Sequence, residues 1–113
     1  MANTVRAALL QTDWAGTKEA MLDKHEQAVH DAKKEKAQVM CFQELFYGPY
    51  FCQVQDPEYY AYTEAIPDGS TTKRFQSLAK ETGMVLVLPM YEIVRPGLYY
   101  NTAAVIDADG KYL

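Results

Sequence analysis

Two patterns of hydrophobic and polar positions alternate along the chain and predict its secondary structure. Short, almost continuous apolar runs bounded by turn-forming residues are typical of strands inside a sheet, and they cover residues 5–11, 37–43, 84–92 and 99–106. The segments 17–36 and 71–82 instead carry apolar residues at helical spacing. These residues are Met21, Leu22, His25, Ala28, Val29 and Ala32 in the first segment and Phe75, Leu78 and Ala79 in the second. The predicted order is strand, helix, strand, helix, strand, strand.

The residues at the ends of the predicted helices support these boundaries. Thr17 is a suitable N-cap for the first helix, and Glu19 places negative charge in its first turn. Lys33 and Lys34 place positive charge near its end, where this charge offsets the helix dipole. Gly83 directly follows the second helix, at the position where glycine commonly stops one.

The connections between the strands predict a mixed sheet in an α/β fold. Strand, helix and strand within about 40 residues form a right-handed crossover, which makes those strands parallel. The link at residues 95–97 is too short for a crossover, so the last two strands should be antiparallel. A tight turn at 107–110 leads into residues 111–113, which begin another strand. Because helices on one face leave the other face uncovered, we expect residues 1–113 to be the N-terminal segment of a single, larger domain.

The stretch 39–53 contains the main candidate for chemistry, because its apolar run ends on Glu44. Ligands of open α/β sheets bind just beyond the carboxyl ends of the strands. The long loop after Glu44 is rich in aromatic residues, which argues against disorder although we expect no regular structure in it. Its first aromatic residues should partly shield the Glu44 carboxylate from water, which would suit this group to act as a general base. They are Phe46, Tyr47, Tyr50 and Phe51.

Each candidate side chain also has a purely structural interpretation. Glu44 is compatible with a strand-end acid that pairs with a base or caps a loop. Tyr50 and Phe51 either line a substrate pocket or form the core of the loop, and Tyr50 is the stronger candidate for lining it. Glu92 ends the third strand as Glu44 ends the second, so it either contacts substrate at the same edge or is a solvated acid of the hairpin.

Composition and charge argue against several other classes of function. The net charge of −4 and the pI of about 5.1 disfavour nucleic acid or an anionic membrane as a partner. The chain has no apolar run of the roughly 20 residues that span a bilayer and no signal-peptide pattern, so we expect a cytoplasmic protein. Cys41 and Cys52 should be free thiols. The cysteine and histidine spacings fit no zinc motif, so no metal site is expected.

Three sequence motifs occur together and in a fixed order. They are Cys41-Phe42-Gln43-Glu44 with its aromatic loop, Pro67-Asp68-Gly69 before the second helix, and Tyr100-Asn101-Thr102-Ala103 leading to Asp107-Ala108-Asp109-Gly110-Lys111. The set resembles the carbon–nitrogen hydrolase (nitrilase) superfamily over essentially the whole chain. It looks most like the branch that acts on N-carbamoyl amines, namely the N-carbamoylputrescine amidases and β-ureidopropionases.

The resemblance implies the N-terminal portion of an α-β-β-α sandwich, with a mixed sheet and helices on one face, that forms a homodimer or higher oligomer. It implies hydrolysis of a small amide or ureido substrate by a Glu-Lys-Cys triad without metal or organic cofactor. Glu44 matches the general base. The family's lysine would come shortly after Lys111 and its cysteine much later, so the 113 residues alone should be inactive. Cys41 and Cys52 match scaffold positions.

Two alternatives stay open. A nitrilase or ω-amidase of the same superfamily would act on a different acyl group, and the aromatic loop alone does not define the substrate. A non-catalytic α/β module would instead bind a small ligand or a partner through the exposed face of the sheet. A lysine soon after Leu113 and a later cysteine at a strand end would favour the hydrolase over the module.

Overall fold

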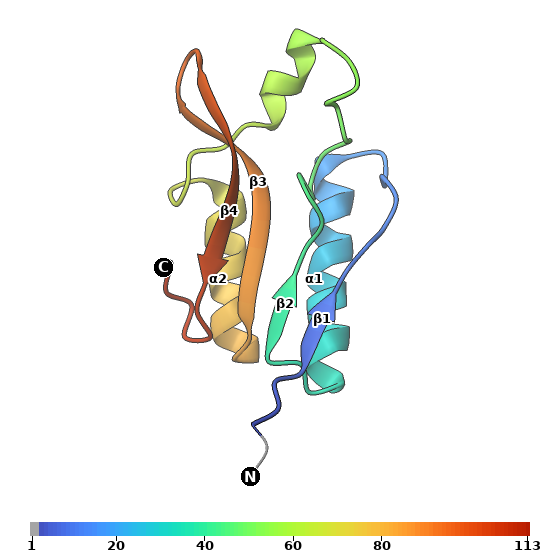
Figure 1. Cartoon of the computed structure of the whole chain (residues 1–113), viewed down its shortest axis with the longest axis vertical. Helices are drawn as coiled ribbons and strands as arrows, with labels where there is room; N and C mark the ends of the chain where they lie inside the picture. Colours follow the sequence, from blue (N-terminus) through green and yellow to red (C-terminus); the bar gives the residue numbers. More distant parts are fainter. Residues whose placement is uncertain (1–2) are drawn as a thin grey trace.

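The structure, a computed structural model, describes residues 3–113 (Figure 1). Within this range four strands form one sheet in the order β1-β2-β3-β4: β1 Ala7–Leu9, β2 Val39–Cys41, β3 Val85–Arg95 and β4 Leu98–Ile106. Neighbouring strands are parallel from β1 to β3, and β4 is antiparallel to β3. The helices α1 (Lys18–Lys34) and α2 (Ser70–Thr82) cover the same face of the sheet (Figure 1). The predicted mixed α/β fold is confirmed.

Both helices begin and end as the sequence predicts. The Thr17 hydroxyl accepts a hydrogen bond from the Ala20 amide at 3.1 Å, which caps the first turn of α1. Gly83 ends α2 in the left-handed conformation, with φ of 67°, and its amide donates to the Ala79 carbonyl at 2.8 Å. A residue with a Cβ adopts this conformation only with strain, which explains the glycine.

The hydrophobic core lies between the helices and the sheet. Side chains alternate along β3, so that Leu86, Leu88 and Met90 are fully buried under the helices. An aromatic cluster fills the centre of this layer, with ring centroids 4.7–5.6 Å apart; its members are His25, Phe42, Phe46 and Phe75. The opposite face, here called the outer face, carries the other residues of the alternation. These are Val87, Pro89 and Tyr91 on β3 and their cross-strand partners Val105, Ala103 and Asn101 on β4.

Three local predictions need correction. The first strand was expected to be buried, but β1 is a short edge strand and Leu9 is 83% exposed, because it has one neighbouring strand and faces outward. The long loop contains a 3₁₀ helix, η1 (Pro57–Tyr62), which Asp56 caps by accepting from the Glu58 amide at 2.9 Å. The strand expected at residues 111–113 appears as a single bridge between Ile106 and Tyr112.

No helix within residues 3–113 combines the length and the apolar character needed to cross a membrane. The assignment of residues 1–113 to the N-terminal segment of a single domain stays a prediction.

Candidate active site

Glu44 lies three residues beyond β2, in a segment that is fixed on both sides. The Phe42 and Phe46 amides donate to the Val87 and Pro89 carbonyls of β3 at 3.1 and 3.2 Å. On the other side, the Gln43 side-chain oxygen accepts from the Thr12 amide at 2.9 Å. The backbone around Glu44 is therefore tied to β3 and to the loop that follows β1.

A hydrogen bond from β4 orients the Glu44 carboxylate. The Asn101 amide nitrogen, Nδ2, donates to Glu44 Oε1 at 2.6 Å, across 57 residues of sequence. Sequence reasoning placed Asn101 in a motif but did not connect it with Glu44. The connection depends on the register of β4, because Asn101 stands opposite Tyr91 and faces outward. Asn101 is a positioning residue for the carboxylate.

The expected shielding of Glu44 by aromatic residues is wrong for the described residues, because the carboxylate is exposed. Leu45 has a φ of 51°, and the chain turns sharply there. Phe46 and Tyr47 are buried in the core, while Tyr50 is 55% exposed. The aromatic residues that follow Glu44 thus support the loop from below instead of covering the acid.

A hollow of about 620 Å³ opens beside Glu44 on the outer face. It is lined by Leu9, Leu10, Gln11, Cys41, Phe42, Gln43, Glu44 and Tyr50. The neighbouring Cys52 side chain and the negative charge of Glu44 raise the pKa of the Tyr50 phenol. The structure therefore brings Glu44 and Tyr50 together around one space, although whether Tyr50 binds substrate stays a prediction.

Glu92 does not reach this hollow in the structure. Its Oε1 accepts from the Thr102 hydroxyl at 2.8 Å. Glu92 follows Tyr91 on β3, and successive side chains of a strand point to opposite faces. It therefore lies on the other side of the sheet from Asn101 and the Glu44 carboxylate. The substrate-binding role predicted for Glu92 stays a prediction.

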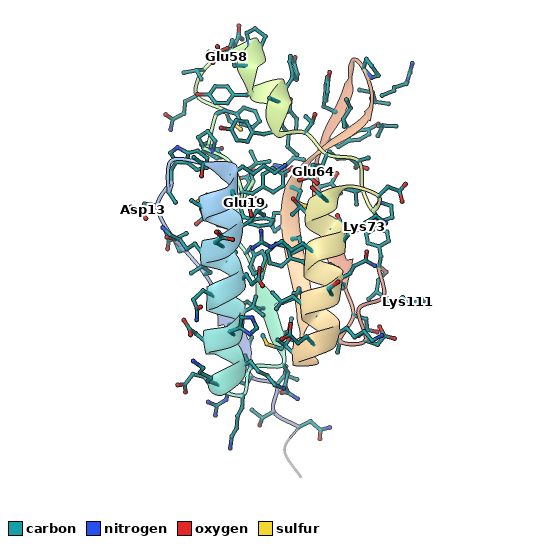
Figure 2. All side chains as sticks on the ribbon, turned by 180° about the vertical axis from the view of Figure 1, so that it is seen from behind. Asp13, Glu19, Glu58, Glu64, Lys73 and Lys111 are labelled. Atoms are coloured by element: carbon teal, nitrogen blue, oxygen red, sulfur yellow. The ribbon has the colours of Figure 1, made fainter. Side chains whose placement is uncertain are left out.

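A second acid, Glu64, holds the start of α2 and was missed by sequence reasoning. Its carboxylate pairs with Lys18 at 2.7 Å and accepts from both the amide and the hydroxyl of Thr71. Figure 2 shows Glu64 at the N-terminal end of α2. Burial alone would raise the pKa of Glu64, but the Lys18 and Thr71 donors outweigh burial and lower it. A Cβ at Gly69 would lie 2.6 Å from Glu64 Oε1, so glycine is required for this approach.

Only an indirect feature of the sequence could have pointed to the role of Glu64 at the start of α2. The α2 N-cap is Gly69, which has no side chain to cap the helix. A helix start without a capping side chain requires another acceptor, and a nearby acid can supply it.

Within residues 3–113, no cluster of three or more His, Cys, Asp or Glu side chains has the arrangement of a metal site.

His25 lies directly beneath the Glu44 segment and is fully buried. Its Nδ1 is 2.7 Å from the Met21 carbonyl, whereas no partner for Nε2 exists among the described residues. The rings of Phe42 and Phe46, which flank Glu44 in the sequence, lie 4.9 and 4.7 Å from the His25 ring. Burial, assisted by the nearby Lys24 charge, lowers the pKa of His25 although the Met21 carbonyl favours the charged form.

Lowering the pH from about 7.5 to about 5.5 is expected to reduce stability through His25. Its folded-state pKa lies below the usual 6.5, so the unfolded chain binds the proton more readily. The contribution of His25 to stability is complete above the pKa that His25 has in the unfolded chain. It is lost as the pH falls through the lower pKa that His25 has in the folded protein. Thermal unfolding at several pH values should show a smaller pH dependence in His25→Leu. A slope in His25→Leu equal to that of the wild type would contradict the prediction.

The fold and site together define an α/β protein that presents a strand-end carboxylate, held by an amide, beside an open hollow. The family model described as carbon-nitrogen hydrolase matches residues 6–113, and the chain belongs to this family. The predicted family is therefore confirmed.

Individual relatives agree with this membership. The N-carbamoylputrescine amidase of Solanum lycopersicum is 40% identical over 88 residues, which are 78% of this chain and 29% of that protein. The omega-amidase of Bos taurus is 32% identical over 111 residues, covering 97% of this chain and 38% of that one. A crystal structure of a carbon-nitrogen hydrolase from Helicobacter pylori G27 has a TM-score of 0.85 at 28% identity, with 96% of this chain and 37% of that chain covered. The chain thus spans about a third of the length of these proteins.

Proposed function

We propose that the complete protein hydrolyses non-peptide carbon–nitrogen bonds in linear amides or N-carbamoyl amines, with Glu44 as general base. The observation that carries this proposal is the Glu44 carboxylate, which is fixed by Asn101 at 2.6 Å and faces a hollow of about 620 Å³. A carboxylate that is held in place and open to a ligand-sized space meets the geometric requirement for a general base. Membership in the carbon-nitrogen hydrolase family supports the reaction class.

The remaining groups of the Glu-Lys-Cys triad would come from sequence beyond residue 113. In the proposed reaction Glu44 takes the proton of the cysteine thiol while the sulfur attacks the carbonyl carbon. The carbon–nitrogen bond then breaks, and the leaving nitrogen receives that proton. Water next attacks the acyl group, Glu44 takes its proton, and the thiol is regenerated. The lysine would stabilise the oxyanion in both steps.

The two cysteines of this chain are not assigned as the nucleophile. The Cys41 thiol donates to the Phe42 carbonyl at 3.4 Å and belongs to β2. Cys52 is exposed on the long loop. Both are free thiols, as predicted. We assign them scaffold roles, and residues 1–113 alone are expected to be inactive.

The second candidate is an ω-amidase of the same superfamily. The observation that favours it is the Bos taurus omega-amidase, whose similarity extends over 97% of this chain. A non-catalytic module is supported only by the exposed outer face, on which Leu9 is 83% exposed. Assembly as a homodimer or higher oligomer and a cytoplasmic location stay predictions.

A panel of substrates tests the proposal. The complete enzyme is expected to release ammonia from N-carbamoylputrescine or N-carbamoyl-β-alanine faster than from simple aliphatic amides. The reason is that the Solanum lycopersicum N-carbamoylputrescine amidase is 40% identical to the chain where they match, whereas the Bos taurus omega-amidase is 32% identical. The measurement is kcat/KM for each compound with an ammonia assay. Preference for an ω-amide would establish the second candidate instead. Failure to hydrolyse any compound of the panel would contradict the proposed function.

A further inference from the structure

A second hollow, here called the lysine hollow, lies between α2 and the turn that follows β4. Its volume is about 470 Å³, which lies in the range of small-ligand sites. Among the described residues no apolar side chain lines it, and it shares no lining residue with the hollow beside Glu44. The lining residues are Lys73, Gln76, Ser77, Lys80, Asp109, Gly110 and Lys111. The lysine hollow therefore suits a small polar ligand better than an acyl chain or an aromatic ring.

Four of the lining residues form one stripe along α2. Residues three, four and seven positions apart lie on the same face of a helix. Lys73 and Lys80 therefore point to the same side, and Gln76 and Ser77 lie between them. Figure 2 shows Lys73 on α2 and Lys111 on the C-terminal segment, both on the side of α2 that lies away from α1. Two elements thus bring three ammonium groups to one hollow.

The turn that carries Lys111 is held against α2. The Gln76 side-chain nitrogen, Nε2, donates to the Gly110 carbonyl at 3.0 Å. A Cβ at Gly110 would lie 2.8 Å from the Gln76 carbonyl oxygen, so the turn packs directly on the helix. Within the turn, the Asp107 amide donates to the Lys111 carbonyl at 2.8 Å, and the Lys111 amide donates to Asp109 Oδ1 at 2.9 Å. The backbone on both sides of the lysine hollow is therefore fixed without a ligand.

The positive charge of the lysine hollow is not neutralised by the protein, unlike that of the neighbouring arginine. Arg74 follows Lys73 on α2 and pairs with three acids of α1 at 2.5–2.9 Å. By contrast, Lys73, Lys80 and Lys111 form no ion pair within residues 3–113. Asp109 is the one acid that the described residues contribute to the lining. The hollow thus has an excess of two positive charges in a chain whose net charge is −4.

We propose that the lysine hollow binds a small phosphate-type anion with at least two negative charges, such as diphosphate. A lysine ammonium group attracts such an anion as a point charge and offers it three N–H donors. Lysines from α2 and from the turn reach the anion from two sides. Because no aromatic ring of the described residues lines the hollow, the anionic group itself is recognised. The proposal does not depend on the hydrolysis proposed for Glu44.

Calorimetric titration of the complete protein with inorganic diphosphate tests the proposal. We expect saturable binding and a higher midpoint of thermal unfolding when diphosphate is present. The double variant Lys73→Gln/Lys80→Gln should raise the Kd for diphosphate about tenfold, the size expected for two exposed charged contacts. The double variant Lys33→Gln/Lys34→Gln is the matched control. It removes two exposed lysines from the last turn of α1 and should keep the wild-type Kd.

Lys111→Gln tests whether the turn and α2 act together, and it should also raise the Kd for diphosphate. An unchanged Kd in Lys111→Gln would overturn the proposal, because the turn would then have no part in the site. An equal rise in the two double variants would overturn it as well, since net charge alone would explain the binding. All of the exchanged lysines are exposed, so the variants should fold as the wild type does.

Other anions separate specific binding from a general effect of salt. Sulfate at the same ionic strength should raise the unfolding midpoint less than diphosphate does. Equal stabilisation by sulfate, or no binding of diphosphate, would overturn the proposal. Tighter binding of a polyglutamate peptide through the same lysines would also overturn it and assign the surface to an acidic protein partner.

Methyl diphosphate distinguishes the two sources of such an anion. Binding as tight as that of inorganic diphosphate would support a diphosphate ester as the ligand, and weaker binding would support the free anion. Either result agrees with an anion site in the lysine hollow. The proposed function is tested separately, because none of these titrations measures hydrolysis.

Discussion

Replacing Glu44 with glutamine is expected to lower kcat of the complete enzyme by about 10²–10⁴-fold, the usual contribution of a general base. Glutamine keeps the length of the side chain and an oxygen at the position of Oε1. That oxygen still accepts the hydrogen bond that Asn101 donates at 2.6 Å. An amide, however, does not take a proton from a thiol or from water at neutral pH. The variant should therefore lose turnover while its fold and its substrate binding persist.

The measurement combines ammonia release with thermal unfolding of the same preparation. Glu35→Gln, at the exposed C-cap of α1, makes the same chemical change away from the hollow and should leave kcat unchanged. Asn101→Ala keeps the base but removes its orienting bond, so its loss of kcat should be smaller than that of Glu44→Gln. A Glu44→Gln enzyme with a kcat close to that of the wild type would show that Glu44 is not the base.

The elements of the fold could be predicted because their signals are local. The helical spacing in α1 and α2, the Thr17 cap and the Gly83 stop each depend on a few neighbouring residues. The short link between β3 and β4 likewise allows only an antiparallel hairpin. These features do not depend on residues far away in the sequence, so they could be predicted from the sequence alone.

The arrangement of the site could not be predicted, because it depends on register and on the conformation of single residues. The bond from Asn101 to Glu44 requires that β4 pair with β3 in one particular register. A shift by one residue would turn Asn101 to the helix side of the sheet. Glu44 is exposed next to a turn at Leu45, where φ is 51°. Leucine rarely adopts this left-handed conformation, so the sequence does not predict the turn.

The placement of the acids illustrates the same limit. Glu92 was predicted to end the third strand and either to contact substrate at the same edge as Glu44 or to be a solvated acid of the hairpin. In the structure β3 continues to Arg95, and the alternation along it puts Glu92 on the other side of the sheet from Glu44. Glu64 was not singled out from the sequence, yet its side chain is largely buried and joins Lys18 to the start of α2. The chemistry of each acid is therefore set by tertiary contacts that composition and spacing do not contain.

Replacing Phe46 with alanine is expected to cost about 3–5 kcal/mol of folding free energy, the range for a large aromatic residue removed from a core. Phe46 is completely buried, and its ring contacts those of His25, Phe42, Tyr47 and Phe75 at centroid distances of 4.7–5.6 Å. The void would open in the centre of the layer between the helices and the sheet. A loss of this size is a large part of the roughly 5–15 kcal/mol that stabilises a typical domain.

The readout is the midpoint of thermal unfolding of the complete enzyme, which should fall by roughly 10 °C. Tyr100→Ala removes an aromatic ring that is 50% exposed, and its effect should stay within about 0.5 kcal/mol. Phe46→Leu refills part of the volume and should recover much of the loss. Because the Phe46 ring packs beneath the segment that carries Glu44, the alanine variant should lose activity below its unfolding temperature as well. If Phe46→Ala were no less stable than Tyr100→Ala, the aromatic cluster would not be what supports the Glu44 segment.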